Sequence, residues 1–234
     1  MLARFARSAQ ALPRAFLDLL FPPRCVACRS AGEWFCAKCQ SRIEKIKPPF
    51  CVRCGRPLQA ESYSCGCKIA MHVDGVRALA YFENEMRDAI HALKYDGRVE
   101  LAPIFGLMLK DYLAVHPLDA GVIVPVPLHP DRERARGYNQ SRLIANELGK
   151  QVNLPVLGNS LRRARATQPQ FELNARERRA NVRNAFIANT EVAGARVLLV
   201  DDVCTTGATM DECSIALRSM GAQTVWGLAL ARGR

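Results

Sequence analysis

The stretch VLLVDDVCTTGAT, residues 197–209, joins four aliphatic residues, two adjacent aspartates and a run of small and hydroxylated residues. Four aliphatic residues in a row are typical of a strand that is buried on both faces of a parallel sheet. Ligands of such sheets bind beyond the carboxyl ends of the strands. We therefore expect Asp201 and Asp202 at the exposed tip of this strand, and residues 205–209 in the turn into a helix. Such a turn suits a phosphate, and the carboxylates suit ribose hydroxyls or a metal-bound diphosphate.

The surrounding sequence alternates between strand and helix patterns, which predicts an α/β fold with a mostly parallel sheet and helices on both faces. We expect strands at 73–83, 121–128, 155–157, 197–200 and 224–231, and helices within 84–116, near 141–152 and at 209–221. The helical stretch 84–116 is interrupted near Asp96 and Gly97, and a polar, arginine-rich stretch precedes residue 197. We divide the chain into a cysteine-rich module, residues 1–67, and an α/β domain, residues 68–234.

Eight of the ten cysteines lie in the N-terminal module, in the pairs CVAC, CAKC, CVRC and CGC. Two thiolates on a tight turn can both reach one tetrahedral metal ion, so the pattern predicts two structural Zn²⁺ sites with no open coordination position. The simplest partition is sequential, although crossed pairing stays open, and a disulfide framework is the alternative. The proposed ligands are Cys25, Cys28, Cys36 and Cys39 for one ion, and Cys51, Cys54, Cys65 and Cys67 for the other.

The chain is basic, with a formal net charge of +11, which two Zn²⁺ ions held by eight thiolates lower to about +7. The remaining charge suits nucleic acid or phosphorylated ligands, and the ribbons either brace the fold or contact nucleic acid. The arginine-rich N-terminal segment is interpreted as a short docking helix, with a transit peptide or a membrane-surface helix as the alternatives. No apolar run is long enough for a transmembrane helix, and we expect a cytoplasmic protein.

The motif VLLVDDVCTTGAT resembles the phosphoribosyl diphosphate (PRPP) binding signature of type I phosphoribosyltransferases. The resemblance implies that Asp201 and Asp202 bind the ribose hydroxyls. It also implies that the 5′-phosphate is bound by Thr205, Thr206, Gly207, Ala208 and Thr209. Cys204 departs from the pattern, since an aliphatic residue is expected there, and we interpret it as a small apolar substitute.

Further motifs extend this resemblance along the chain. GVIVPVPLHP looks like the strand and diphosphate loop of these enzymes, in which the backbone of Pro125, Val126 and Pro127 faces the leaving group. Only Val126 among these three carries an N–H. RRARATQPQ resembles the mobile catalytic loop, especially that of the amidotransferase branch, which makes Thr167 and Gln168 candidate substrate-binding residues.

Taken in order, the cysteine-rich N-terminus, HALKYDG, VPVPLHPDRERARGYNQ, RRARATQPQ and VLLVDDVCTTGAT are similar to the ComF (competence protein F) family, also called the GntX-like family. The similarity extends from about residue 21 to residue 231. It implies a type I phosphoribosyltransferase fold behind a double zinc ribbon, PRPP and Mg²⁺ as ligands, and a role in natural transformation with single-stranded DNA and competence proteins as partners.

Arginines gather where a diphosphate would leave, because stabilising that charge is the main demand of phosphoribosyl transfer. One group lies within residues 162–183, and the second consists of Arg132, Arg134 and Arg136. We expect Arg134, Arg136 and Arg163 to act in catalysis, since guanidinium groups bind phosphate oxygens in a bidentate way; the alternative is a solvated basic face. The candidate substrate-binding residues beside them are Tyr138, Asn139 and Gln140.

HALKYDG, residues 91–97, permits two interpretations. Lys94 and Tyr95 could face the second substrate, with the ring stacking on a base, or the segment could be a helix C-terminus capped at Gly97. For the whole chain, two functions remain. One is an Mg²⁺-dependent phosphoribosyltransferase that acts on an unidentified acceptor; the other is a non-catalytic module that binds nucleotides or single-stranded DNA. No general base for an acceptor is evident.

Overall fold

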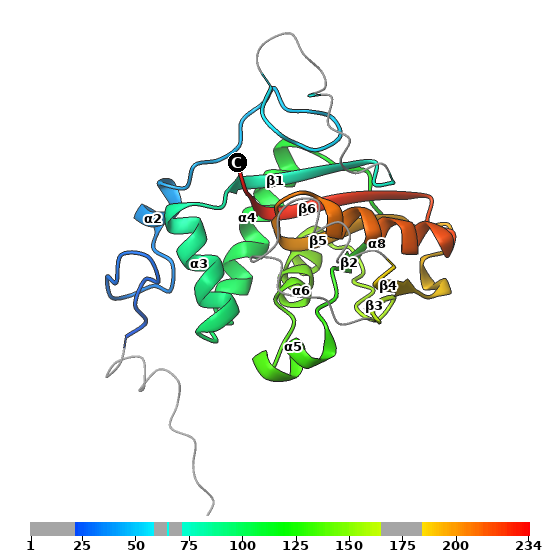
Figure 1. Cartoon of the computed structure of the whole chain (residues 1–234). Helices are drawn as coiled ribbons and strands as arrows, with labels where there is room; N and C mark the ends of the chain where they lie inside the picture. Colours follow the sequence, from blue (N-terminus) through cyan, green and yellow to red (C-terminus); the bar gives the residue numbers. More distant parts are fainter. Residues whose placement is uncertain (1–21, 59–64, 66–71, 165–183) are drawn as a thin grey trace, which may run out of the picture.

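The computed structural model describes residues 22–58, 65, 72–164 and 184–234 of the chain. A parallel sheet of four strands, in the order β1-β6-β5-β2, forms its centre (Figure 1). The strands are β1 (Gly75–Tyr81), β2 (Val122–Pro125), β5 (Arg196–Cys204) and β6 (Thr224–Arg232). The α/β class with a parallel sheet is therefore confirmed.

Helices cover both faces of the sheet. One face carries α3 (Asn84–Tyr95), α4 (Leu101–Val115) and α6 (Gln140–Val152), and the other carries α8 (Ala208–Ser219) with the antiparallel pair β3 (Leu161–Arg163) and β4 (Phe186–Ala188). Side chains of β5 alternate between the two cores: Leu198 and Val200 belong to the first, Val197 and Leu199 to the second. The aliphatic run thus forms a strand that is buried on both faces, as predicted.

Four elements differ from the sequence-based expectation. Strand β5 does not end at Val200 but continues to Cys204, because β6 pairs with it as far as Arg232. A short helix, α5 (Pro130–Arg136), follows β2, and β3 begins the arginine-rich stretch; neither was among the expected elements. The short strand expected at 155–157 is a single bridge between Val156 and Ile123.

The cysteine-rich segment packs on the sheet domain. The linker between α2 and the second cysteine cluster passes the outer edge of β1, where Lys45 forms an antiparallel β-bridge with Ala80. The short helix α2 (Ala37–Ser41) lies beside α3, and the loop that follows the linker lies along β1 (Figure 1). Buried residues of the first cysteine pairs, Cys25 and Cys39 among them, share one hydrophobic core with α3.

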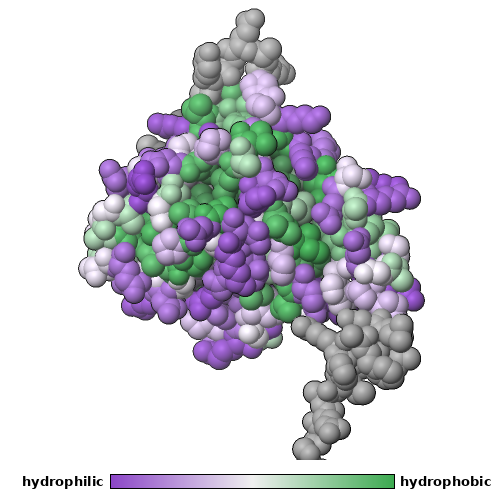
Figure 2. All heavy atoms as spheres, turned by 180° about the vertical axis from the view of Figure 1, so that it is seen from behind, coloured by the Kyte–Doolittle hydropathy of each residue, from purple (hydrophilic) through white to green (hydrophobic). Residues whose placement is uncertain are grey.

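The surface of the molecule is mixed in character. On the side opposite to the view of Figure 1, hydrophobic and hydrophilic residues are intermixed (Figure 2). Within the described part of the chain, no helix combines the length and the hydrophobicity needed to cross a bilayer. The N-terminal segment interpreted as a docking helix lies outside the described residues.

Candidate functional site

The acidic pair of β5 is buried, not exposed. Asp201 is 9% exposed and Asp202 is 3% exposed, so the expectation that the two carboxylates stand at an exposed strand tip is wrong. The physical reason is that β5 runs two residues past the pair and that α3 and α6 cover it. Asp202 meets Lys94 of α3, and Asp201 meets Ser141 at the start of α6.

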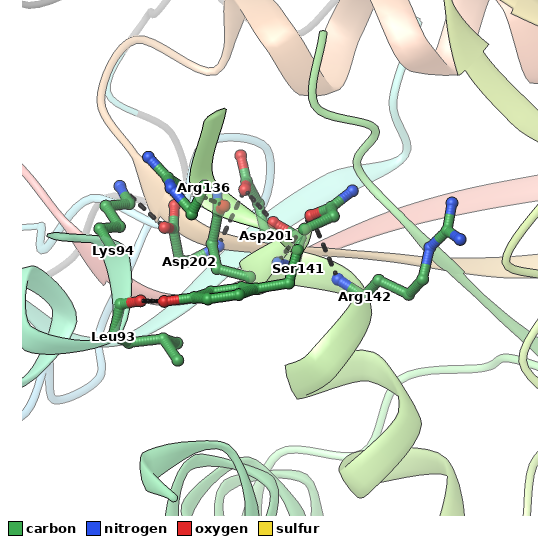
Figure 3. Close-up of polar contacts among 10 residues, drawn as sticks. Leu93, Lys94, Arg136, Ser141, Arg142, Asp201 and Asp202 are labelled. Atoms are coloured by element: carbon green, nitrogen blue, oxygen red, sulfur yellow. Dashed lines mark hydrogen bonds and ion pairs between the residues drawn. The ribbon is translucent and has the colours of Figure 1, made fainter. Parts of the chain in front are cut away.

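Each carboxylate has a defined partner (Figure 3). Ser141 Oγ, at the start of α6, donates to Asp201 Oδ1 over 2.8 Å, and the backbone N–H of Asp202 donates to the same oxygen over 2.9 Å. Lys94 Nζ, in the last turn of α3, lies 2.7 Å from Asp202 Oδ2. Burial, and next the charge of Asp202, raise the pKa of Asp201 well above its usual range, although Lys94 and Ser141 oppose the rise. The pair is therefore a buried polar cluster whose charge is partly neutralised by Lys94.

Three successive residues of α3 fasten its last turn to the site. The Tyr138 hydroxyl donates to the carbonyl of Leu93, Lys94 pairs with Asp202, and the Arg136 guanidinium lies 5.5 Å from the centre of the Tyr95 ring. Helix α3 ends at Tyr95, and Gly97 follows with φ of +67°, which agrees with the helix C-terminus; contact of Lys94 and Tyr95 with a second substrate stays a prediction. The helix ends near Gly97, and its last turn reaches the acidic pair.

The segment that connects α5 to α6 forms one wall of the site. Arg136 donates to the side-chain carbonyl of Gln140, and Asn139 caps α6 by accepting from the N–H groups of Ser141 and Arg142. Asn139 Nδ2 also donates to the carbonyl of Val126 over 3.0 Å. The structure thus brings Lys94, Tyr95 and the segment 136–140 together around the acidic pair, and their roles in binding a substrate stay predictions.

The loop proposed to hold the 5′-phosphate leads directly into the N-terminus of α8. Gly207 adopts φ of +78° and precedes α8, and the Thr206 hydroxyl accepts from the N–H of Ala208 over 3.4 Å. Thr205, Thr206 and Thr209 are half-buried beside it. Cys204, just before the loop, is buried, and burial raises the pKa of its thiol to about 11. This environment agrees with a small apolar substitute and disfavours a reactive thiolate.

The loop at 125–127 lies beside β5, with Pro125 paired with Val200. The Val126 N–H, which we expected to face a leaving group, donates to the carbonyl of Val200 over 2.9 Å. That donor is committed to the sheet in this structure. A diphosphate contact by the backbone of residues 125–127 stays a prediction, and it requires this bond to open.

The three arginines expected to act in catalysis have different environments. Arg163 is 8% exposed and its guanidinium lies 5.4 Å from the centre of the Phe186 ring; burial, and next the charge of Arg132, lower its pKa. Arg136 lies at the site, as described above. Arg134 is different, because its side chain is 74% exposed and pairs with Asp131 on the surface of α5. Thr167 and Gln168 lie outside the described residues.

The cysteines form two clusters in the sequential partition. The sulfur atoms of Cys25, Cys28, Cys36 and Cys39 lie within 4.8 Å of one another, and so do those of Cys51, Cys54 and Cys65; Cys67 lies outside the described residues. Cys28 and Cys36 are separated by 3.7 Å between sulfur atoms, and the Ser30 hydroxyl lowers the pKa of Cys28 to about 6. A compact set of four thiols fits the tetrahedral coordination of Zn²⁺.

Sequence reasoning missed two kinds of functional neighbour. Ser141 carries no motif of its own, although it directly follows the motif GYNQ. Arg77 and Arg232 are buried strand residues that donate to the carbonyls of Val52 and Cys54 in the second cysteine cluster. An arginine within a strand gives no sign in the sequence of which loop it meets.

Comparison with known proteins matches two domain families to the chain. Residues 16–68 match the double zinc ribbon domain, and residues 136–233 match the phosphoribosyl transferase domain. Among solved structures, the chain resembles a glutamine PRPP amidotransferase from B. subtilis, at 24% identity and a TM-score of 0.39, over 56% of this chain and 26% of that one. It also resembles a purine phosphoribosyltransferase from Pyrococcus horikoshii, at 16% identity and a TM-score of 0.33, over 57% of this chain and 73% of that one.

The curated relatives are similar over nearly the whole chain. Competence protein F of Haemophilus influenzae is 34% identical over 89% of this chain and 97% of its own length. The DNA utilization protein YhgH of Escherichia coli K12 is 32% identical over 92% of this chain and 99% of its own. Competence protein ComFC of Bacillus subtilis is 26% identical over 81% and 80%, respectively. A double zinc ribbon, a phosphoribosyltransferase fold and this similarity together show that the chain belongs to the competence protein F family.

Proposed function

We propose that the protein binds PRPP, with the ribose on the acidic pair of β5 and the 5′-phosphate at the N-terminus of α8. The observation that carries the proposal is the continuity of these parts. Asp201 and Asp202 lie on the same strand that ends at Cys204, and four residues later α8 begins behind the left-handed Gly207. Burying two adjacent carboxylates costs desolvation free energy, so packing of the core alone does not account for them.

Transfer of the phosphoribosyl group is the reaction that this site would support. Cleavage of the bond from C1′ to the diphosphate leaves positive charge on the sugar and negative charge on the leaving group. Arg136 and the buried Arg163 are the cations that flank the site for that charge. Mg²⁺, bound together with PRPP, would neutralise the phosphates. The acceptor is unassigned, and no described residue stands out as its general base.

Calorimetric titration of PRPP with Mg²⁺ tests the binding. The wild type should release or take up heat with a defined stoichiometry, and the double variant Asp201→Asn/Asp202→Asn should bind at least about tenfold more weakly, since it loses two charged acceptors. Asp111→Asn is the matched control, because Asp111 is 73% exposed on α4. Equal binding by the wild type and the double variant would remove the proposed site.

A second candidate function is the binding of single-stranded DNA, which suits the printed names of the relatives. The observation that favours it is an aromatic and basic strip on the exposed side of α3. His91 and Tyr95 pack edge to face with ring centres 5.3 Å apart, and Tyr95 is 64% exposed. Arg136, over the Tyr95 ring, and Arg98, stacked on Trp34, provide cations. Exposed rings beside cations are the usual platform for unpaired bases.

We expect the affinity for a single-stranded oligonucleotide to fall steeply with salt, because phosphate contacts release counterions. Tyr95→Ala should weaken binding by roughly 1–3 kcal/mol, the usual contribution of one stacked base. Leu107→Ala, an exposed apolar residue of α4, should leave it unchanged. Fluorescence anisotropy at several salt concentrations measures both effects, and binding that ignores salt would exclude this function. With either function, we propose action in the cytoplasm together with proteins of the competence machinery.

A further inference from the structure

Two neighbouring carboxylates are the usual protein ligands of a divalent cation, yet a lysine stands at this pair. Lys94 Nζ lies 2.7 Å from Asp202 Oδ2, with 18% of the lysine side chain and 4% of the aspartate side chain exposed. Apart from this ion pair, Asp202 Oδ2 accepts no hydrogen bond among the described residues. The Lys94 ammonium group is therefore the positive charge that pairs with this oxygen.

The position of Lys94 is fixed by the residues on either side of it. Leu93 accepts a hydrogen bond from Tyr138 (Figure 3), and the Tyr95 ring lies against the Arg136 guanidinium. Lysine side chains on a surface usually move freely, but this one leaves a helix turn that is attached at both neighbouring residues. Lys94 also lies between the two segments that match known domains, residues 16–68 and 136–233. It is a contribution of α3 to a site whose other residues come from the phosphoribosyl transferase domain.

Asp201 is also partly occupied. Its Oδ1 accepts from both Ser141 Oγ and the N–H of Asp202. A divalent ion would have to compete with these donors and with Lys94 at close range, where like charges repel strongly. Neutral hydroxyl groups face no such repulsion and need only the free lone pairs of the carboxylates.

We propose that Lys94 is the resident cation of the acidic pair, which excludes a divalent metal ion from Asp201 and Asp202 and reserves them for the neutral hydroxyls of a ribose 5-phosphate group. Lys94 is thus a residue that determines specificity, acting through Asp202. The choice of ribose 5-phosphate rests on the proposed function, whereas the exclusion of metal does not. Any Mg²⁺ in the complex then belongs to the phosphates of the ligand.

Mn²⁺ is the probe for the first half of the proposal, with free and bound ion distinguished by electron paramagnetic resonance in zinc-loaded protein. The wild type should show no Mn²⁺ site that depends on Asp202. Lys94→Met should gain one Mn²⁺ site. Its affinity for Mn²⁺ should exceed that of the wild type by on the order of tenfold or more, since a neighbouring unit charge changes such equilibria by one to three powers of ten. Lys94→Met/Asp202→Asn should lose that site again, and Lys94→Arg should behave as the wild type because it keeps the charge.

Lys150→Met is the matched control, since it removes a lysine of α6 whose side chain is 66% exposed, and it should leave Mn²⁺ binding unchanged. Lys94→Gln provides a second test if Lys94→Met does not fold, as judged by zinc content and circular dichroism. An Asp202-dependent Mn²⁺ site in the wild type, or no gain in either folded Lys94 variant, would overturn the exclusion.

Ribose 5-phosphate tests the second half, by calorimetry without added divalent ions. The wild type should bind it, and Asp202→Asn should bind at least about tenfold more weakly, since it loses a charged acceptor. A gain of Mn²⁺ binding in Lys94→Met without any binding of ribose 5-phosphate or PRPP would refute the proposed function and leave the exclusion standing. Ligand binding by the wild type that depends on a metal ion at Asp202 would refute the exclusion and leave the proposed function standing.

Discussion

Asp201 lies in a buried environment that disfavours the charged form of its carboxyl group. Burial, and next the charge of Asp202, raise the pKa of Asp201 to about 7, whereas an aspartate in an unfolded chain titrates near about 4. Between these values the folded protein binds more protons than the unfolded chain, so the free energy of unfolding falls as the pH rises. We expect the wild type to lose on the order of 1–3 kcal/mol between about pH 5 and pH 8 through this group, and Asp201→Asn to lose less, as measured by urea unfolding.

The control for this pH dependence is Asp111→Asn on the surface of α4, which should retain the wild-type slope. An Asp201→Asn variant with the full slope would show that other groups cause the dependence. At this scale the sequence singled out the acidic pair and the segment 136–140, and the structure places the two close together. The sequence did not predict the burial of the pair or the contact with Lys94, because both depend on where α3 ends in space.

Among the elements, the loop that carries the second cysteine cluster is held closely against β1. Gly55 adopts φ of +68°, and a Cβ atom there would lie 2.4 Å from the carbonyl oxygen of Val76. Gly97 has nearly the same conformation, φ of +67°, with nothing within 4 Å of such an atom. Gly97→Ala should therefore cost only the strain of a left-handed residue, about 1–2 kcal/mol.

We predict that Gly55→Ala costs a further 1–3 kcal/mol or so, because the added methyl group pushes the loop away from the strand. It should also lower the zinc content, whereas Gly97→Ala should not. Urea unfolding and metal analysis measure the two effects. Equal stability and equal zinc content in the two variants would mean that the loop is free to move from β1.

At the level of elements, the sequence predicted the parallel strands and the main helices, because the regular spacing of apolar residues that marks them is visible within each segment itself. It missed α5, in which seven mostly charged residues have no buried face, although Pro130 at the first helical position is a starting signal. It also ended β5 too early, because the extension to Cys204 is stabilised by β6, a partner distant in sequence.

In the whole molecule, the cysteine-rich segment and the sheet domain share their interior. Phe35 and Cys39 lie in the same core as Leu93 of α3. The buried guanidinium groups of Arg77 and Arg232 donate to carbonyls of the second cluster, and a buried charge that loses its partner is strongly destabilising. The division at residues 67 and 68 is therefore proposed as a boundary between family domains and not as a boundary between units that unfold independently.

The two tryptophans of the chain allow this cooperativity to be tested, because Trp34 lies in the first cysteine-rich segment and Trp226 lies on β6. We expect Trp34→Phe and Trp226→Phe, each with one remaining tryptophan, to show fluorescence transitions at the same urea concentration when zinc is bound, since a shared core unfolds as one unit. Removal of zinc by a chelator should shift both transitions to lower urea concentration, because metal binding contributes directly to the free energy of folding, and added zinc should restore them. A zinc-bound protein in which the signal of Trp34 changes well before that of Trp226 would instead show that the ribbon unfolds on its own while the parallel sheet stays folded.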